Sequence, residues 1–305
     1  MPSNNEKRDR IELSVVILSY NTKQITLDCL SSVVRSLSEE LAKKAEIVVL
    51  DNNSTDGSQK AIENYAKQHT LIKLIRSKEN LGFSKGNNKA VQITKGAYVL
   101  FLNSDAIIKD RAIDKLLDVM KKSDDVAVLG PKLLNSDGSQ QPSCGPFYSL
   151  PVVFAALFLR GDYWGLTRFS PCQFQKVDWT SGACILMKRA LFEKLSGFDE
   201  NIFMYMDEID LLYRAKKKGY ITYVTPDVEI VHLASASSSK RTFPILQVYC
   251  GLLYFYKKHH STLKLQILKG MLQLKAHIAY FIGTITQNNY LMKTYAEAQK
   301  MVDMA

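Results

Sequence analysis

A strand, a turn and the start of a helix follow one another in Ile47-Val48-Val49-Leu50-Asp51-Asn52-Asn53-Ser54-Thr55-Asp56-Gly57-Ser58. The apolar residues predict a buried strand, Gly57 permits a tight turn, and Ser58 can cap the helix that follows. In open α/β sheets, polar residues at the carboxyl end of a buried strand face the ligand crevice. We therefore expect Asp51 and Asn53 to contact a ligand.

The same alternation of β-branched runs and amphipathic stretches extends over the first 130 residues. It predicts a largely parallel sheet flanked by helices. Strands are expected at Leu13–Leu18, Glu46–Leu50, Leu71–Arg76, Ala97–Leu102 and Asp125–Leu129. Helices are expected at Thr26–Leu37, Ser58–Gln68, Ser84–Thr94 and Arg111–Lys121. Because parallel strands end at one edge of the sheet, the loops after the first four strands should face one crevice.

The pattern changes after Gly130, where Asn135–Gly138 predicts a hairpin turn. The apolar run Leu150–Leu159 is too short to span a bilayer and predicts a buried or interfacial helix. Further elements are expected at Cys184–Met187, Arg189–Leu195, Ile209–Lys218, Ile221–Val224 and Val228–Val231. We expect one α/β domain over residues 11–235 and a basic, amphipathic helical region over residues 236–305.

Composition excludes several classes of protein. The chain has 305 residues, of which 46% are hydrophobic and 23% charged, so disorder is not expected. Its five cysteines are widely spaced and never form CxxC, so neither a disulfide framework nor a structural zinc site is expected. Met1–Arg10 lacks the apolar core of a secretory signal. Together these features predict a cytoplasmic location. Neither GxGxxG nor GxxxxGK[ST] occurs, which argues against a dinucleotide dehydrogenase and a P-loop NTPase.

Three further strand-end loops carry candidate ligand contacts. Ser19-Tyr20-Asn21 follows the first strand, and Tyr20 can either stack beside a base or simply pack. Asn80–Asn88 offers two glycines that let the backbone approach a ligand, Lys85 for a phosphate, and Asn87. Asn103-Ser104-Asp105 suits a hard divalent cation that bridges two phosphate oxygens, although an Asx turn is the alternative.

A second group of acidic residues opens a helix in Tyr205–Arg214. Asp207, Glu208 and Asp210 repel one another unless a metal, a helix amino terminus or a substrate charge offsets them. Asp210 has the (i, i+4) spacing of a structural ion pair with Arg214, and Asp207 can cap the helix. Glu208 is then the candidate general base, with a pKa raised by its neighbours. His232, which follows an apolar strand, either packs or contacts a metal or diphosphate.

Read together, these motifs resemble family 2 glycosyltransferases, in particular the rhamnosyltransferase-like branch, over roughly Leu13 to His232. The resemblance rests on Val15–Asn21, Asp51–Ser58, Asn80–Asn88, Asn103–Asp105, Ser181–Ala183, Gly197–Glu200 and Asp207–Asp210. It implies a GT-A fold, a nucleotide site, and inversion at the anomeric carbon by direct displacement.

The resemblance also implies roles for individual residues. Asp51 matches the aspartate that binds the base or ribose, Asp105 the metal-binding aspartate of a DxD-type motif, and His232 a late metal-side histidine. The cation would be Mg²⁺ or Mn²⁺. Many family members have the motif Glu-Asp-x-Asp where this chain has Asp207-Glu208-Ile209-Asp210. Glu208 therefore matches the catalytic base, and Asp207 is the second candidate for that role. The remaining nucleotide contacts are expected at Ser19, Tyr20, Asn21, Asn53, Lys85, Asn87 and Ser104, and the donor or acceptor sugar contacts at Trp179, Gly182 and Ala183.

The expected reaction moves a sugar, with rhamnose as one candidate, from a nucleotide diphosphate to a hydroxyl of a glycan or lipid-linked glycan in cell-surface polysaccharide synthesis. The alternative is a catalytically inactive scaffold subunit. From Ser237 onward the sequence has nine basic and two acidic residues, so +7 of the net charge of +10 lies in this region. Its amphipathic stripe fits an anionic inner membrane surface or a homo-oligomer interface equally well. Lysines spread along a helix are no nucleic-acid recognition motif.

Overall fold

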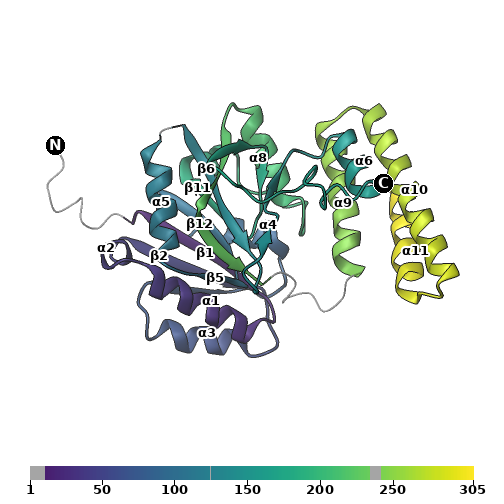
Figure 1. Cartoon of the computed structure of the whole chain (residues 1–305). Helices are drawn as coiled ribbons and strands as arrows, with labels where there is room; N and C mark the ends of the chain where they lie inside the picture. The colour runs from purple at the N-terminus through teal and green to yellow at the C-terminus, as the bar shows by residue number, and fades with distance from the viewer. Residues whose placement is uncertain (1–10, 124, 234–241) are drawn as a thin grey trace.

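The computed structural model describes residues 11–123, 125–233 and 242–305. A central sheet has helices on both faces, and a group of helices at the carboxyl end of the chain lies to one side of it (Figure 1). The main sheet contains β1 (Leu13–Ser19), β2 (Ala45–Asp51), β3 (Ile72–Arg76), β4 (Tyr98–Asn103), β5 (Ala106–Ile108), β6 (Val126–Leu134), β7 (Gln140–Gln141), β9 (Gln175–Val177), β11 (Cys184–Lys188) and β12 (Ile221–His232). β8 (Cys144–Gly145) and β10 (Trp179–Thr180) form a separate antiparallel pair.

The strand order β3-β2-β1-β4-β11-β6-β12-β5 confirms the mixed, largely parallel sheet. β1 pairs in parallel with β2 and β4, and β6 pairs in parallel with β12. β11 runs antiparallel to both of its neighbours, and β5 runs antiparallel to β12. The carboxyl ends of β1, β2 and β4 therefore meet at one edge, as expected from the sequence.

Most of the predicted helices are present with boundaries shifted by a few residues. The helices are α1 (Lys23–Ser36), α2 (Glu39–Ala42), α3 (Ser58–Ala66), α4 (Gly82–Val91), α5 (Ala112–Lys122), α6 (Leu150–Phe158), α7 (Arg189–Lys194), α8 (Asp207–Lys217), α9 (Thr242–His259), α10 (Thr262–Ile285) and α11 (Asn289–Met304). α2 and β5 were not expected. The two strands predicted on either side of Pro226 are one strand, β12, whose register shifts between Thr225 and Glu229.

Both predicted helix caps are wrong. Ser58 is the first residue of α3, and Gly57 precedes it in the left-handed region with φ of 86°. The backbone N–H of Ser58 donates to the Asp56 carboxylate, so Asp56 satisfies the first backbone donor of α3. Asp207 is likewise the first residue of α8, after Met206 at φ of 66°.

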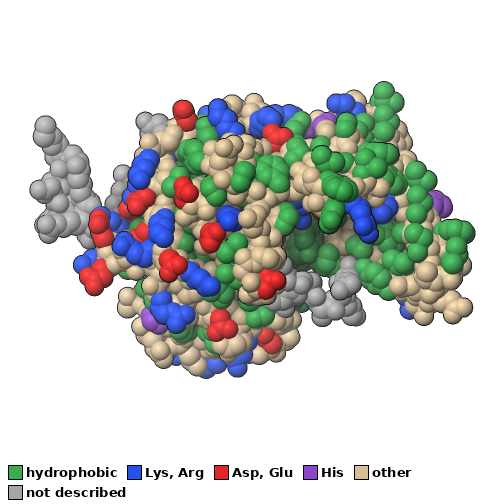
Figure 2. Space-filling model, viewed as in Figure 1, with side chains coloured by type: hydrophobic (Ala, Val, Ile, Leu, Met, Phe, Trp, Pro, Cys, Tyr) green, Lys and Arg blue, Asp and Glu red, His purple; other side chains and the backbone are tan. Residues whose placement is uncertain are grey.

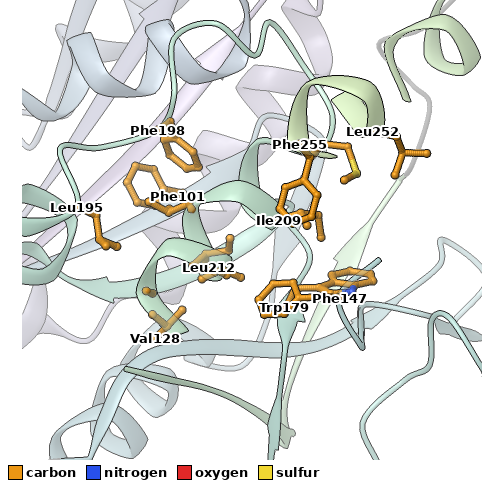
Figure 3. Close-up of a cluster of buried hydrophobic side chains, with 14 of the residues drawn as sticks. Phe101, Val128, Phe147, Trp179, Leu195, Phe198, Ile209, Leu212, Leu252 and Phe255 are labelled. Carbon is orange, nitrogen blue, oxygen red and sulfur yellow. The ribbon is translucent and has the colours of Figure 1, made fainter. Parts of the chain in front are cut away.

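The carboxyl-terminal helices share the core of the α/β domain. Phe255 and Leu252 of α9 lie in one buried cluster with Ile209 and Leu212 of α8 and with Trp179 (Figure 3). The sequence-based boundary between residues 235 and 236 lies outside the described residues. The shared core nevertheless shows that α9 completes the burial of α8.

A buried ion cluster also joins α8 to α9. Asp210 is fully buried, and its carboxylate lies 2.7 Å from the Arg214 Nε, the Lys258 Nζ and the His259 Nε2. Lys258 also lies 2.6 Å from Asp199, which precedes α8. Burial alone would raise the pKa of Asp210, but His259, Arg214 and Lys258 lower it below its ordinary value. The predicted Asp210–Arg214 pair is thus confirmed within a larger cluster.

We predict that Asp210→Asn lowers the free energy of unfolding by about 3 kcal/mol at neutral pH, because it removes the buried carboxylate that Arg214, Lys258 and His259 share. Since the folded-state pKa is lowered, the carboxylate stabilises the fold above its unfolded-state pKa, and this effect fades as the pH falls. The difference between wild type and variant should therefore shrink in acid. Urea unfolding at neutral and acidic pH measures both quantities.

Asp118→Asn, on an exposed position of α5, is the matched control and should change stability by less than about 0.5 kcal/mol. Equal stability of the wild type and Asp210→Asn would contradict the structural role of the cluster.

Candidate active site

A cavity of about 1010 Å³ opens at the carboxyl ends of β1 and β4 and reaches the first turn of α8. Predicted site residues that line it are Ser19, Tyr20, Asn87, Ser104, Asp105, Trp179, Gly182, Ala183, Asp207, Glu208 and His232. Four predicted site residues do not line it: Asn21, Asp51, Asn53 and Lys85. The fold thus brings residues from distant parts of the chain together around one space.

Asp51 lies just behind the cavity wall, at the end of β2. Its side chain is fully buried, and its Oδ1 accepts hydrogen bonds of 2.8 Å from the Ser54 N–H and the Gln59 side-chain amide. Its Oδ2 is buried without a hydrogen-bond partner. A buried acceptor left unpaired is unfavourable by about 1–3 kcal/mol, so this atom suits an N–H donor supplied by a ligand.

Asn21 and Asn53, in the loops after β1 and β2, shape the backbone and do not line the cavity. Asn21 and Asn53 have positive φ angles of 52° and 66°. The Asn21 Oδ1 accepts from the Thr55 N–H at 2.7 Å, and the Asn21 N–H donates to Ser54. These bonds join the loops after β1 and β2. Tyr20, by contrast, lines the cavity with 45% of its surface exposed.

The two glycines of Asn80–Asn88 permit close packing, and Gly82 also lines the cavity. Gly82 has φ of 72°, and a Cβ there would lie 2.5 Å from the Phe203 carbonyl oxygen. A Cβ on Gly86 would meet the Leu18 side chain at 3.1 Å. Lys85 is exposed on α4. The loop therefore holds α4 against the segment that leads into α8.

Asp105 and His232 meet because β5 and β12 are antiparallel neighbours. His232 pairs with Ala106 in that register, and the Asp105 Oδ1 lies 3.2 Å from the His232 Nε2. The His232 Nδ1 lies 2.7 Å from the Gln141 Oε1, and its Nε2 lies 3.3 Å from the Asn103 Nδ2. With the proton on Nδ1 donated to Gln141, the Nε2 lone pair faces the Asp105 carboxylate.

Two acceptors that face each other at this distance suit a cation, so the Asp105–His232 pair fits a divalent metal. In the described part of the chain, no group of three or more His, Cys, Asp or Glu side chains is placed to hold a metal ion. The remaining ligands of such an ion would come from phosphate oxygens and water, as is usual for Mg²⁺ bound with a nucleotide.

The acidic turn of α8 faces this pair from across the cavity. Tyr205 and Met206 both have positive φ angles, 63° and 66°, an unfavourable backbone that tertiary packing must hold in place. Gly251 of α9 supplies part of this packing, since a Cβ there would lie 2.7 Å from the Met206 Cγ. The strained turn aims Asp207 and Glu208 at the cavity.

Burial raises the pKa of both carboxyl groups in this turn. Asp207 is 4% exposed, and the neighbouring charge of Glu208 raises its pKa further. Burial also raises the pKa of Glu208, while Arg168 and the Gly182 N–H act in the opposite direction. Glu208 is the more accessible of the two and lies against Gly182. It is therefore the carboxylate better placed to meet a ligand.

The loop after α6 supplies residues that sequence motifs did not mark. Arg168 lines the cavity, its Nε is buried without a partner, and its guanidinium lies 5.5 Å from the Trp179 ring. Trp179 is only 2% exposed: its Nε1 donates to the Pro146 carbonyl at 2.8 Å, and its ring stacks on Tyr148. Trp179 is thus largely packed, and it lines the cavity together with Arg168 and Tyr148. Only tertiary placement distinguishes this arginine from other surface arginines.

The comparison with known proteins identifies a family. The model described as "Glycosyl transferase family 2" matches residues 14–196, more than half of the chain. N-acetylglucosaminyl-diphospho-decaprenol L-rhamnosyltransferase of Mycobacterium tuberculosis is 27% identical over 80% of this chain and 86% of its own length. The low-salt glycan biosynthesis hexosyltransferase Agl10 of Haloferax volcanii is 25% identical over 72% of this chain and 67% of its own.

Solved structures agree on the fold. The mannosyltransferase PcManGT from Pyrobaculum calidifontis, solved with GDP-Man and Mn²⁺, has a TM-score of 0.59 at 16% identity and covers 97% of this chain and 76% of its own. TarS residues 1–349 from S. aureus give a TM-score of 0.54 at 14% identity, covering 96% and 90%. These similarities confirm the expected GT-A fold, and with the family match they show that this chain belongs to glycosyl transferase family 2.

Proposed function

We propose that this glycosyltransferase moves a sugar from a nucleotide diphosphate donor to a hydroxyl of a lipid-linked glycan, with inversion, in the synthesis of a cell-surface polysaccharide. The proposal is carried by one observation: the Asp105–His232 pair and the Glu208 carboxylate line the same cavity. The rhamnosyltransferase relative makes rhamnose the first sugar to test.

The donor would bind along the strand-end loops. The unpaired Oδ2 of Asp51 would accept an N–H of the base, and Tyr20 would lie beside the base at the cavity edge. Asp105 and His232 would hold Mg²⁺ or Mn²⁺, which when bound offsets the charge of the diphosphate. In this arrangement the anomeric carbon would lie between the diphosphate and the α8 turn.

Glu208 would act as the general base on the acceptor. Its carboxylate takes the hydroxyl proton as the acceptor oxygen bonds to the anomeric carbon, and the bond from that carbon to the diphosphate oxygen breaks on the opposite face. The configuration is inverted in one displacement, so no covalent sugar–enzyme bond forms. The raised pKa of Glu208 makes its carboxylate a stronger proton acceptor than an exposed glutamate.

Two features of the cavity support a lipid-linked, anionic acceptor. Arg168 is the one Lys or Arg side chain among the described residues that line it. Phe203, Phe243 and Val248 also line it, and each is more than one third exposed. A cavity that holds one arginine and a partly exposed apolar set suits a phosphate group attached to a hydrocarbon chain. An inactive scaffold would not need both acidic sites, so the catalytic role is favoured.

We predict that Glu208→Gln lowers kcat at least about 100-fold and leaves nucleotide binding unchanged, because only the proton acceptor is lost. Transfer is measured with candidate nucleotide sugars and a lipid-linked acceptor, and nucleoside diphosphate binding by calorimetry. Glu193→Gln, on an exposed face of α7, is the control and should keep full activity. If Asp207→Asn abolished transfer while Glu208→Gln did not, Asp207 would be the base.

The acidic limb of the kcat profile should lie at a higher pH than an ordinary glutamate would give, since burial raises the pKa of Glu208. Activity is lost as the pH falls through that pKa, because the protonated carboxyl cannot accept the hydroxyl proton. Arg168→Gln removes a charge that lowers this pKa, so it should move the limb to still higher pH. A limb at or below the ordinary pKa of glutamate would contradict the assignment.

We also predict that a divalent cation raises the melting temperature of the protein only when a nucleoside diphosphate is present. Thermal unfolding is followed with UDP, GDP and dTDP, with and without Mn²⁺ or Mg²⁺, and again after a chelator is added. Asp105→Asn should lose the metal-dependent part of the shift, since it removes the one carboxylate of the pair. A metal-dependent shift of equal size in this variant would place the cation elsewhere.

A further inference from the structure

Helix α10 has two apolar sides, and only one of them is packed. Its buried residues are Leu268, Leu272, Ala276, Ala279 and Gly283. The opposite side exposes a second apolar set, which we call the outer face: Leu263, Ile267, Leu274, Ile278, Phe281 and Ile285. The exposed fractions run from 41% at Ile278 to 71% at Leu263. Solvent-exposed apolar side chains in such number mark an interaction surface.

The outer face is one straight stripe. Its residues recur at intervals of three, four or seven, so at 3.6 residues per turn they fall within a sector about 60° wide. The stripe extends from Leu263 to Ile285, about 33 Å at 1.5 Å per residue. Hydrophobic side chains gather along the outer edge of the carboxyl-terminal helices in Figure 2.

The charges beside this stripe are basic. α10 contains Lys264, Lys269 and Lys275 and no acidic residue. By helical position Lys264 and Lys275 flank the stripe on one side, where a long side chain can bury its stem and keep its ammonium group in water. With the region's net charge of +7, the stripe suits an anionic partner.

A second exposed apolar group lies on a neighbouring element. α6 packs against α10, and Tyr163, Trp164 and Leu166 in the loop after α6 are 77%, 68% and 55% exposed. Tyrosine and tryptophan are enriched at the boundary between lipid headgroups and acyl chains. The loop therefore exposes residue types common at a membrane interface, directly after a helix that packs against α10.

We propose that the outer face of α10 docks on the surface of an anionic lipid bilayer, with its apolar side chains below the headgroups and Lys264 and Lys275 at phosphate level. A second copy of the chain is a poorer occupant, because it would bring another net charge of +7 against the first. The helix would lie along the surface. Within the described residues, none of the helices is long and apolar enough to cross a bilayer.

The test is co-sedimentation of the full-length protein with vesicles of phosphatidylcholine, alone or mixed with phosphatidylglycerol. We expect binding to the mixed vesicles that weakens at high salt. The double variant Leu274→Ser/Phe281→Ser should bind at least about tenfold more weakly, because two exposed apolar side chains are lost. Lys264→Gln and Lys275→Gln should each weaken binding to mixed vesicles roughly fivefold, from about 1 kcal/mol per basic residue.

Ile93→Ser, at an apolar position 45% exposed near the end of α4, is the matched control and should bind as the wild type does. Absence of wild-type binding to mixed vesicles would overturn the proposal, as would a wild-type dimer that Leu274→Ser/Phe281→Ser converts to monomers without changing vesicle binding. Docking does not depend on the proposed reaction. Glu208→Gln should therefore still bind vesicles, and a failure of docking is distinguishable from a failure of transfer.

Discussion

The buried carboxylate of Asp210 accepts contacts of 2.7 Å from Arg214, Lys258 and His259. It is the third acidic residue in the first turn of α8, and it is the one with a full set of partners. Because it ties α8 to α9, the turn that precedes it can hold two successive residues in the left-handed region. The geometry of Asp207 and Glu208 therefore depends on an ion cluster that touches no substrate.

The opposite wall of the cavity depends on backbone pairing. Asp105 ends a turn after β4 and His232 ends β12, and the β5–β12 ladder brings them within 3.2 Å of each other. With the His232 proton on Nδ1 towards Gln141, the His232 Nε2 and the Asp105 carboxylate face each other as acceptors, an arrangement that suits a cation. The α8 turn holds Tyr205 and Met206 in a strained backbone conformation, and such departures gather where a ligand is bound.

The strands and the chemically distinctive residues could be predicted from the sequence, but their neighbours could not. Hydrophobic periodicity located β1, β2 and β4, and strand-end position pointed to Asp105. The Asp105–His232 contact rests on β5, a strand of three residues that gives no periodic signal. Arg168 lies in an irregular loop, so its approach to Glu208 depends on tertiary structure and has no sequence signal. The sequence also did not show that Gly82 and Gly86 pack against Phe203 and Leu18, because it does not reveal which distant segments come close.

The carboxyl-terminal helices share one buried core with the α/β domain, although their composition differs from it. α9 fills the core beside α8, holds Asp210 through Lys258 and His259, and lines the cavity with Phe243 and Val248. α10 packs on α9 and carries the outer face. One packed unit thus links the acidic turn of α8 to the outer face of α10.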